Sequence, residues 1–162
     1  MLKHTSIARY PVPSAVVIKM FTDKKFHIAK LEASGLAGYE VLSHQFDGKE
    51  FSIKVERRVP MNAPGLVKKF FGAETKVVNE ESWTVKTKTG RVQVQPAGVP
   101  VEMSCTSSMA DEGGGCVITY LWQVNAKIPL VGGALEKFIV SDLEKRAAEE
   151  TVLAIAQIKD YT

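Results

Sequence analysis

The sequence predicts an α+β fold in which an antiparallel sheet is followed by one long C-terminal helix. Between residues 39 and 126, apolar and polar side chains alternate in short runs, which is the pattern of strands buried on one face. Turn-forming residues separate these runs. From Gly132 to Lys159 the pattern is that of a helix, about 42 Å long at 1.5 Å per residue. A helix of this length can lie across a curved sheet and enclose a cavity with it.

Length and composition are those of one globular domain, which we expect to span residues 1–162. The net charge of +3 is too small and too dispersed to indicate nucleic-acid binding. No apolar run approaches the ~20 residues that cross a bilayer, and Met1–Ser6 lacks an apolar signal core. We therefore expect a cytoplasmic protein without stable membrane insertion. The sequence does not indicate a protein partner.

The chain begins with a predicted strand, Leu2–Tyr10, which the prolines after it end. Ser14 is a candidate N-cap for a short helix that ends near residue 20. Asp23 is a candidate cap for a second helix, Lys24–Ala33. We expect these two helices to bury apolar residues against the sheet: Val16, Val17, Phe26, Ile28 and Leu31.

Further strands are predicted over residues 39–46, 50–59, 75–89, 91–95, 101–110 and 115–126. Asp47-Gly48 is a two-residue hairpin signal between the first two of these strands. Gly90 is expected to turn the third strand into the fourth, and Asp111–Gly115 to connect the last two. Leu66–Phe71 is predicted to form a helical turn.

The two cysteines lie in the last predicted hairpin. A turn around residues 111–115 places Cys105 near Tyr120, and Cys116 near Met109 or Ala110. The two thiols then do not face each other, so the sequence predicts no disulfide.

Three segments carry a resemblance to a known family: Arg57–Pro60, Glu81-Ser82-Trp83, and Ile128–Glu136 with the sequence IPLVGGALE. With the order of elements, they resemble the START-like (SRPBCC) superfamily, the helix-grip fold of the birch-pollen allergens and polyketide cyclases. The resemblance covers essentially the whole chain and is greatest to a bacterial branch of uncharacterised function. It implies a curved antiparallel sheet of about six to seven strands around a long C-terminal helix, with two short helices after strand 1. It also implies a hydrophobic cavity between sheet and helix. The superfamily includes lipid carriers, receptors, cyclases and aromatases, so the fold alone does not choose the activity.

Arg57 is the most anomalous residue of the strand pattern. By alternation it shares a face with Phe51, Ile53, Val55 and Val59, and a charge on an apolar face needs a partner or water. The strand could fray near its end and release Arg57 to solvent, which we favour. Arg57 could instead form an internal ion pair or contact an acidic ligand with its planar donors.

Glu81 presents the same question on another strand. It shares a face with Asn79 and Trp83, and it could pair with Arg57 across neighbouring strands. A strand shifted by one residue would instead expose Glu81 and place Glu80 and Ser82 inside.

The apolar stripe of the C-terminal helix is interrupted by charge. Residues 135, 139 and 143 are apolar, but Asp142, Arg146 and Glu150 follow on the same side. Asp142 and Arg146 could form an i,i+4 pair. These residues could face a partly polar cavity. If the helix instead rotates or projects past the sheet, they face solvent, which is the alternative that we favour.

The predicted ligand-binding residues are Arg57, Glu81, Trp83, Met103, Tyr120, Trp122, Leu135, Phe138, Ile139 and Asp142. The three histidines are scattered, and no nucleophile elbow, phosphate loop or dinucleotide fingerprint occurs, so we predict no catalytic residue, metal or cofactor.

These observations leave three functions open. The first is binding of a hydrophobic or amphipathic small molecule, lipid or polyketide-like, with Arg57 orienting an acidic group. The second is a cyclase or aromatase that uses Glu81, Asp142 or Tyr120 as acid or base. The third is an interaction module with a filled core and an apolar patch on the loop Met61–Phe71, which could equally be a lid.

Overall fold

The structure, a computed structural model, describes residues 1–35, 38–60, 65–68 and 74–162. Its elements in chain order are β1 (Leu2–Tyr10), α1 (Ser14–Phe21), α2 (Lys24–Ala33), β2 (Gly38–Phe46), β3 (Glu50–Pro60), α3 (Gly65–Lys68), β4 (Glu74–Thr84), β5 (Thr89–Pro96), β6 (Val101–Glu112), β7 (Gly115–Ala126), α4 (Gly132–Gln157) and the 3₁₀ turn η1 (Ile158–Asp160).

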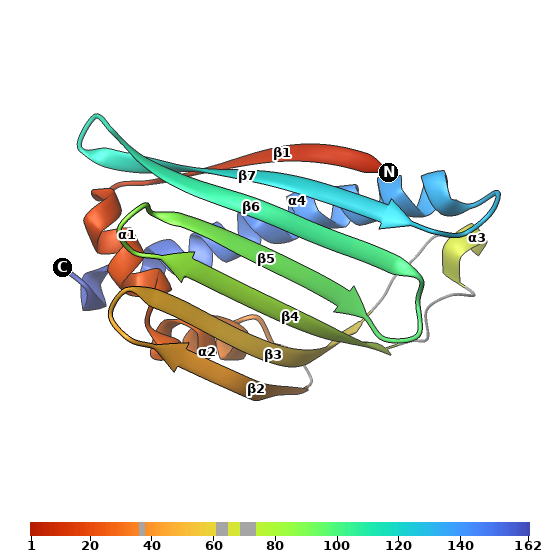
Figure 1. The fold of residues 1–162 in the computed structure, drawn as a ribbon, viewed down its shortest axis with the longest axis horizontal. Coiled ribbons are helices and arrows are strands. Elements are labelled where there is room, and N and C mark those ends of the chain that lie inside the picture. Colours follow the sequence, from red (N-terminus) through yellow and green to blue (C-terminus); the bar gives the residue numbers. More distant parts are fainter. Residues whose placement is uncertain (36–37, 61–64, 69–73) are drawn as a thin grey trace.

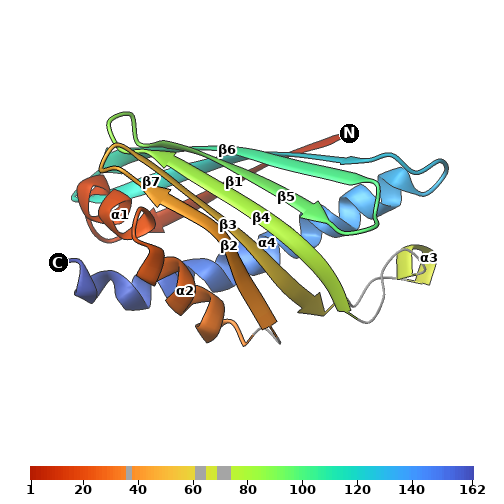
Figure 2. The same cartoon turned by 60° about the horizontal axis from the view of Figure 1, so that its bottom comes forward.

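The described strands form one seven-stranded antiparallel sheet in the order β1-β7-β6-β5-β4-β3-β2 (Figure 1). The sheet arches over α4, which runs along its concave face, and α1 and α2 lie at the end of the sheet near the C-terminus (Figure 2). This is the predicted α+β helix-grip arrangement, with two short helices after the first strand.

The second helix begins and ends where the sequence predicts. The Lys25 amide donates to Asp23 Oδ1 over 2.9 Å, so Asp23 is the cap. Of the residues predicted to be buried in the two short helices, Val17, Phe26 and Leu31 are buried, whereas Val16 and Ile28 are half-buried.

The predicted role of Ser14 as an N-cap is wrong. Ser14 is the first residue of α1 and is completely buried. Its amide donates to Asp111 Oδ1 over 2.7 Å, and its Oγ accepts from Lys88 Nζ over 2.6 Å. The cap therefore comes from residues distant in the sequence, at the ends of two hairpins that pack on the start of the helix.

The predicted turn at Gly90 is also misplaced. β4 ends at Thr84, the turn occupies residues 85–88, and Gly90 lies inside β5 opposite Trp83. A Cβ on Gly90 would lie 2.7 Å from Trp83 Cδ2 and 2.8 Å from the Ser82 carbonyl oxygen. Glycine is therefore required here because the indole of Trp83 packs directly on the neighbouring backbone.

The last hairpin has a tighter turn than predicted. Gly113 and Gly114, both with positive φ, form the turn, and the strands on each side extend up to it. Cys105 therefore lies opposite Trp122 instead of Tyr120, and Cys116 lies opposite Asp111. Both cysteines are buried and free.

Two groups of buried side chains lie at opposite ends of the sheet. The group under α1 and α2 is aromatic, with Phe21 stacked on Phe26 at 5.2 Å between ring centroids and edge-on to Trp83 at 5.6 Å. The other group contains Leu135 and Ile139 of α4 together with valines of the central strands. The core of the protein is thus divided in two along the length of α4.

The segment after β3 is described only in part. Helix α3 (Gly65–Lys68) covers the start of the predicted helical turn Leu66–Phe71. The rest of that turn lies outside the described residues, as does most of the predicted patch or lid Met61–Phe71. No helix within the described ranges is long and apolar enough to cross a membrane.

Gly90→Ala tests the packing of Trp83 on β5. We expect the variant to lower the free energy of unfolding by about 1–3 kcal/mol, because the new methyl group has no space. Gly133→Ala is the control, since a Cβ there meets nothing within 4 Å, and it should be neutral or slightly stabilising. Urea denaturation of both variants measures this, and equal stability of the two would contradict the packing argument.

Candidate functional site

A cavity of about 940 Å³ lies between the concave face of the sheet and α4. Its walls come from α1, α2, α4 and six of the strands, and they are mostly apolar. Helix α4 is buried against the rest of the protein only near its two ends, at residues 132–139 and at Ala154, with Ile158 following in η1. The middle of the helix therefore spans the cavity.

Most of the predicted ligand-binding residues line this cavity. The lining includes Arg57, Glu81, Trp83, Met103, Tyr120, Trp122, Phe138, Ile139 and Asp142. Leu135 does not line the cavity, because it is completely buried where α4 packs on the sheet. It anchors the helix instead of facing the open space.

Arg57 projects from the concave face of β3, as the alternation predicts, but the favoured release to solvent is wrong. Its Nη2 donates to Asn79 Oδ1 over 3.0 Å, and its buried Nε has no hydrogen-bond partner among the described residues. A direct pair with Glu81 is not formed, because Arg57 lies opposite Val77 and Glu81 lies opposite Ile53. Burial lowers the pKa of Arg57, an effect opposed by the carboxylates around the cavity. Arg57 is therefore a half-buried cation whose buried Nε–H has no acceptor among the described residues.

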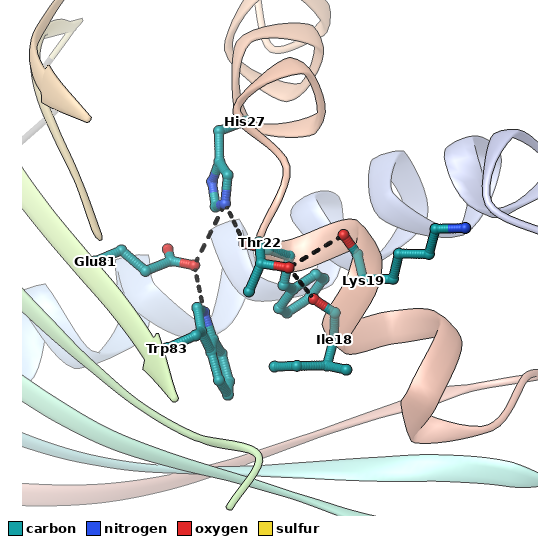
Figure 3. Close-up of polar contacts among 7 residues, drawn as sticks. Ile18, Lys19, Thr22, His27, Glu81 and Trp83 are labelled. Atoms are coloured by element: carbon teal, nitrogen blue, oxygen red, sulfur yellow. Dashed lines mark hydrogen bonds and ion pairs between the residues drawn. The ribbon is translucent and has the colours of Figure 1, made fainter. Parts of the chain in front are cut away.

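Glu81 lies inside, so the alternative strand register with Glu80 inside is wrong; Glu80 is exposed. Trp83 Nε1 donates to Glu81 Oε2 over 2.8 Å, and His27 Nε2 lies 4.0 Å from the same oxygen (Figure 3). Burial by itself raises the pKa of Glu81, but His27, Lys30 and the hydrogen bond from Trp83 together bring the pKa below its ordinary value. Glu81 is thus an ionised carboxylate on the cavity wall.

His27 is a site residue that the sequence analysis missed. It is buried on α2, its ring stacks on Phe51 at 5.1 Å, and its Nε2 donates to the Phe21 carbonyl oxygen over 2.7 Å. Burial lowers its pKa. The four-residue spacing of His27 and Leu31 indicates a shared helix face. That spacing does not reveal that this face meets β3 and β4.

Asp142 and Arg146 of α4 are half-buried and line the cavity, contrary to the favoured exposure to solvent, whereas Glu150 borders the cavity but is exposed, as favoured. Arg146 Nε donates to Asp142 Oδ2 over 2.7 Å, and both side chains are about one-third exposed. Five cavity-lining residues make up what we call the polar belt, which crosses the middle of the cavity: Asp142 and Arg146 on α4, and Arg57, Asn79 and Glu81 on the sheet. No group of three or more His, Cys, Asp or Glu residues in the described ranges could hold a metal ion.

The sequence matches the model of one family, described as "Protein of unknown function (DUF2505)", over residues 5–155. None of the curated proteins matches the chain at a significant level.

Solved structures show the same fold at low sequence identity. The START superfamily protein from Mycobacterium smegmatis is 12% identical, with a TM-score of 0.61 and 99% of each chain covered. TTHA0849 from Thermus thermophilus is 15% identical, with a TM-score of 0.67 and 98% of each chain covered. The Zhui aromatase/cyclase from Streptomyces sp. R1128 is 10% identical, with a TM-score of 0.61, covering 98% of this chain and 92% of its own. The fold is therefore START-like, as the resemblance implies.

The buried position of His27 predicts a pH dependence of stability. The folded-state pKa lies below the ordinary value of about 6.5, so below that pH the unfolded chain binds a proton that the folded protein does not. The free energy of unfolding should fall between pH 7.5 and 5.5, by at most about 1.4 kcal/mol per pH unit from this group. In urea titrations at both pH values, His27→Gln should lose less stability than the wild type; an equal or larger loss would show that His27 is not responsible.

Proposed function

Since the chain belongs to the DUF2505 family, whose function is unknown, and has a START-like fold, we propose that it binds a hydrophobic or amphipathic small molecule, lipid or polyketide-like, between the sheet and α4. The observation that carries this proposal is the cavity itself. Its volume of about 940 Å³ is at the upper end of the range of small-molecule sites. Tight packing is the rule for protein interiors, so a space of this size under an intact helix favours a ligand over a structural defect.

The lining favours an elongated, largely apolar molecule. Val92, Val94 and Met103 contribute apolar wall on one side of the polar belt, and Phe26 and Leu31 do so on the other. A methionine in such a wall adapts to different ligand shapes.

The position of Arg57 on the cavity wall indicates that this molecule carries an acidic group. Its guanidinium is permanently charged and lines the cavity, and Asn79 is the one acceptor in the described residues that it bonds to, so a carboxylate in the cavity would accept from the remaining Nη–H donors. Around Arg57, the carboxylates of Glu150, Asp142 and Glu81 oppose its charge, whereas Arg146 adds to it. With three carboxylates against two guanidinium groups, a ligand group with two negative charges would be repelled more strongly than a singly charged carboxylate.

A cyclase or aromatase activity is the second candidate, because titratable groups lie at the cavity wall. Glu81 is ionised there and is the candidate base, and burial raises the pKa of Tyr120 well above its ordinary value, so that Tyr120 keeps its proton and can donate a hydrogen bond to a substrate oxygen. The aromatase/cyclase with the same fold adds support. Recovery of the bound molecule unchanged after long incubation would favour binding alone. A filled-core interaction module is not favoured, since the core is open.

Arg57→Met tests the acidic group. Calorimetric titration with decanoic acid should show binding about tenfold weaker in this variant, because a charge-assisted hydrogen bond is lost. Binding of 1-decanol should change little.

Arg58→Met is the matched control, since Arg58 is the next residue on β3 and is exposed on the opposite face. It should bind decanoic acid as the wild type does. Failure of the wild type to bind either compound would contradict the proposed function. Equal effects of the two variants would show that Arg57 does not bind the acidic group of the ligand.

A further inference from the structure

We infer that the ligand is recognised at two points: a carboxylate at Arg57 and a hydroxyl group that donates a hydrogen bond to Glu81. This inference rests on the proposed function and specifies its substrate class as hydroxylated carboxylic acids of elongated, mainly apolar shape.

One oxygen of the Glu81 carboxylate is unused. Its Oε2 accepts from Trp83, but no hydrogen bond from the described residues reaches Oε1. The side chain is 21% exposed although it projects from the concave face, and it lines the cavity. Figure 3 shows that both polar contacts of the Glu81 carboxylate, from Trp83 and His27, reach the same oxygen, which leaves the other oxygen available to a ligand in the cavity.

The charge state of this carboxylate decides what can bind to it. An ionised carboxylate accepts hydrogen bonds only, so a ligand group beside Oε1 must be a donor. A ligand with a hydroxyl group there would make the hydrogen bond that a purely apolar chain leaves unmade.

The surrounding charges favour a hydroxyl group over an ammonium group. Two cationic side chains, Lys30 and Arg57, line the cavity and lie close enough to influence Glu81, whereas burial lowers the pKa of His27 and so favours its neutral form. A ligand ammonium would be an additional cation in this group. A neutral donor satisfies Oε1 without that repulsion.

The spacing of the two points follows from the strand register. Arg57 Nη2 bonds to Asn79, which is two residues before Glu81 on the same face of β4. Two strand residues span ~7 Å, so the carboxylate and the hydroxyl of the ligand should be separated by about this distance. Beyond the polar belt the walls are mainly apolar on both sides, with Val92, Val94 and Met103 on one side and Phe26 and Leu31 on the other, so further polar groups that meet these residues would be unfavourable.

The experiment is a calorimetric comparison of decanoic acid, 6-hydroxydecanoic acid and 10-hydroxydecanoic acid. We expect the wild-type protein to bind the 6-hydroxy acid about tenfold more tightly than decanoic acid, the effect of a hydrogen bond to a charged group. The 10-hydroxy acid should bind no more tightly than decanoic acid, because its hydroxyl group reaches the apolar wall. This comparison requires no variant.

Variants then assign the effect to Glu81. Glu81→Gln should reduce the preference for the 6-hydroxy acid to about threefold, and Glu81→Leu should abolish it, with folding of each checked by thermal unfolding. Glu80→Gln, on the exposed face of the same strand, should keep the wild-type preference. Arg57→Met should weaken both acids and leave their ratio unchanged.

The outcomes separate this inference from the proposed function. If decanoic acid binds in an Arg57-dependent way but the hydroxyl group brings no gain, only the two-point inference is overturned. If 6-aminodecanoic acid binds more tightly than the hydroxy acid, the assignment of a hydroxyl group is overturned. If no acid binds, the proposed function itself fails.

Discussion

The site depends on how α4 is held: its side chains are buried near the two ends of the helix and not in the middle. At the start, Leu135 packs in the core, and the buried carboxylate of Glu136 accepts from the Ala126 amide over 2.9 Å. Near the end, Ala154 and Ile158 join the aromatic group under α1 and α2. A stiff helix held at both ends can cross a concave sheet without collapsing onto it. The cavity is therefore a consequence of sheet curvature and helix length together.

The polar belt lies where this span leaves room. Burying ionised groups costs several kcal/mol each unless hydrogen bonds and opposite charges offset the loss of water. Asp142 and Arg146 offset each other, and Trp83 and His27 stabilise Glu81, but Arg57 keeps an unmade hydrogen bond. Stability alone would favour leucines at these positions. Their presence in the cavity is the reason to connect them with a ligand.

Much of the fold followed from residue patterns. Alternation along β3 and β4 correctly placed Arg57 and Glu81 on the apolar face, since successive strand residues point to opposite sides whatever the partner strand is. The hydrogen-bond partners of these two side chains did not follow from the alternation. Arg57 bonds to Asn79 on the neighbouring strand, which depends on the register of β3 against β4, whereas Glu81 accepts from Trp83 two residues further along its own strand. A turn at Gly113-Gly114 instead of one over five residues was enough to shift the last hairpin.

By itself, the sequence determined the class of fold, the long terminal helix, the inward direction of the charged side chains on the strands and the capped helix α2. All of these follow from local backbone geometry and side-chain periodicity. The tertiary structure alone decided that Asp142 and Arg146 face a cavity, that His27 lies beside Glu81 and that Leu135 anchors the helix. These facts depend on the rotation of α4 and on the packing of α2 against the sheet. Both are set by contacts between residues far apart in the chain, and the periodicity of a single segment carries no information about them.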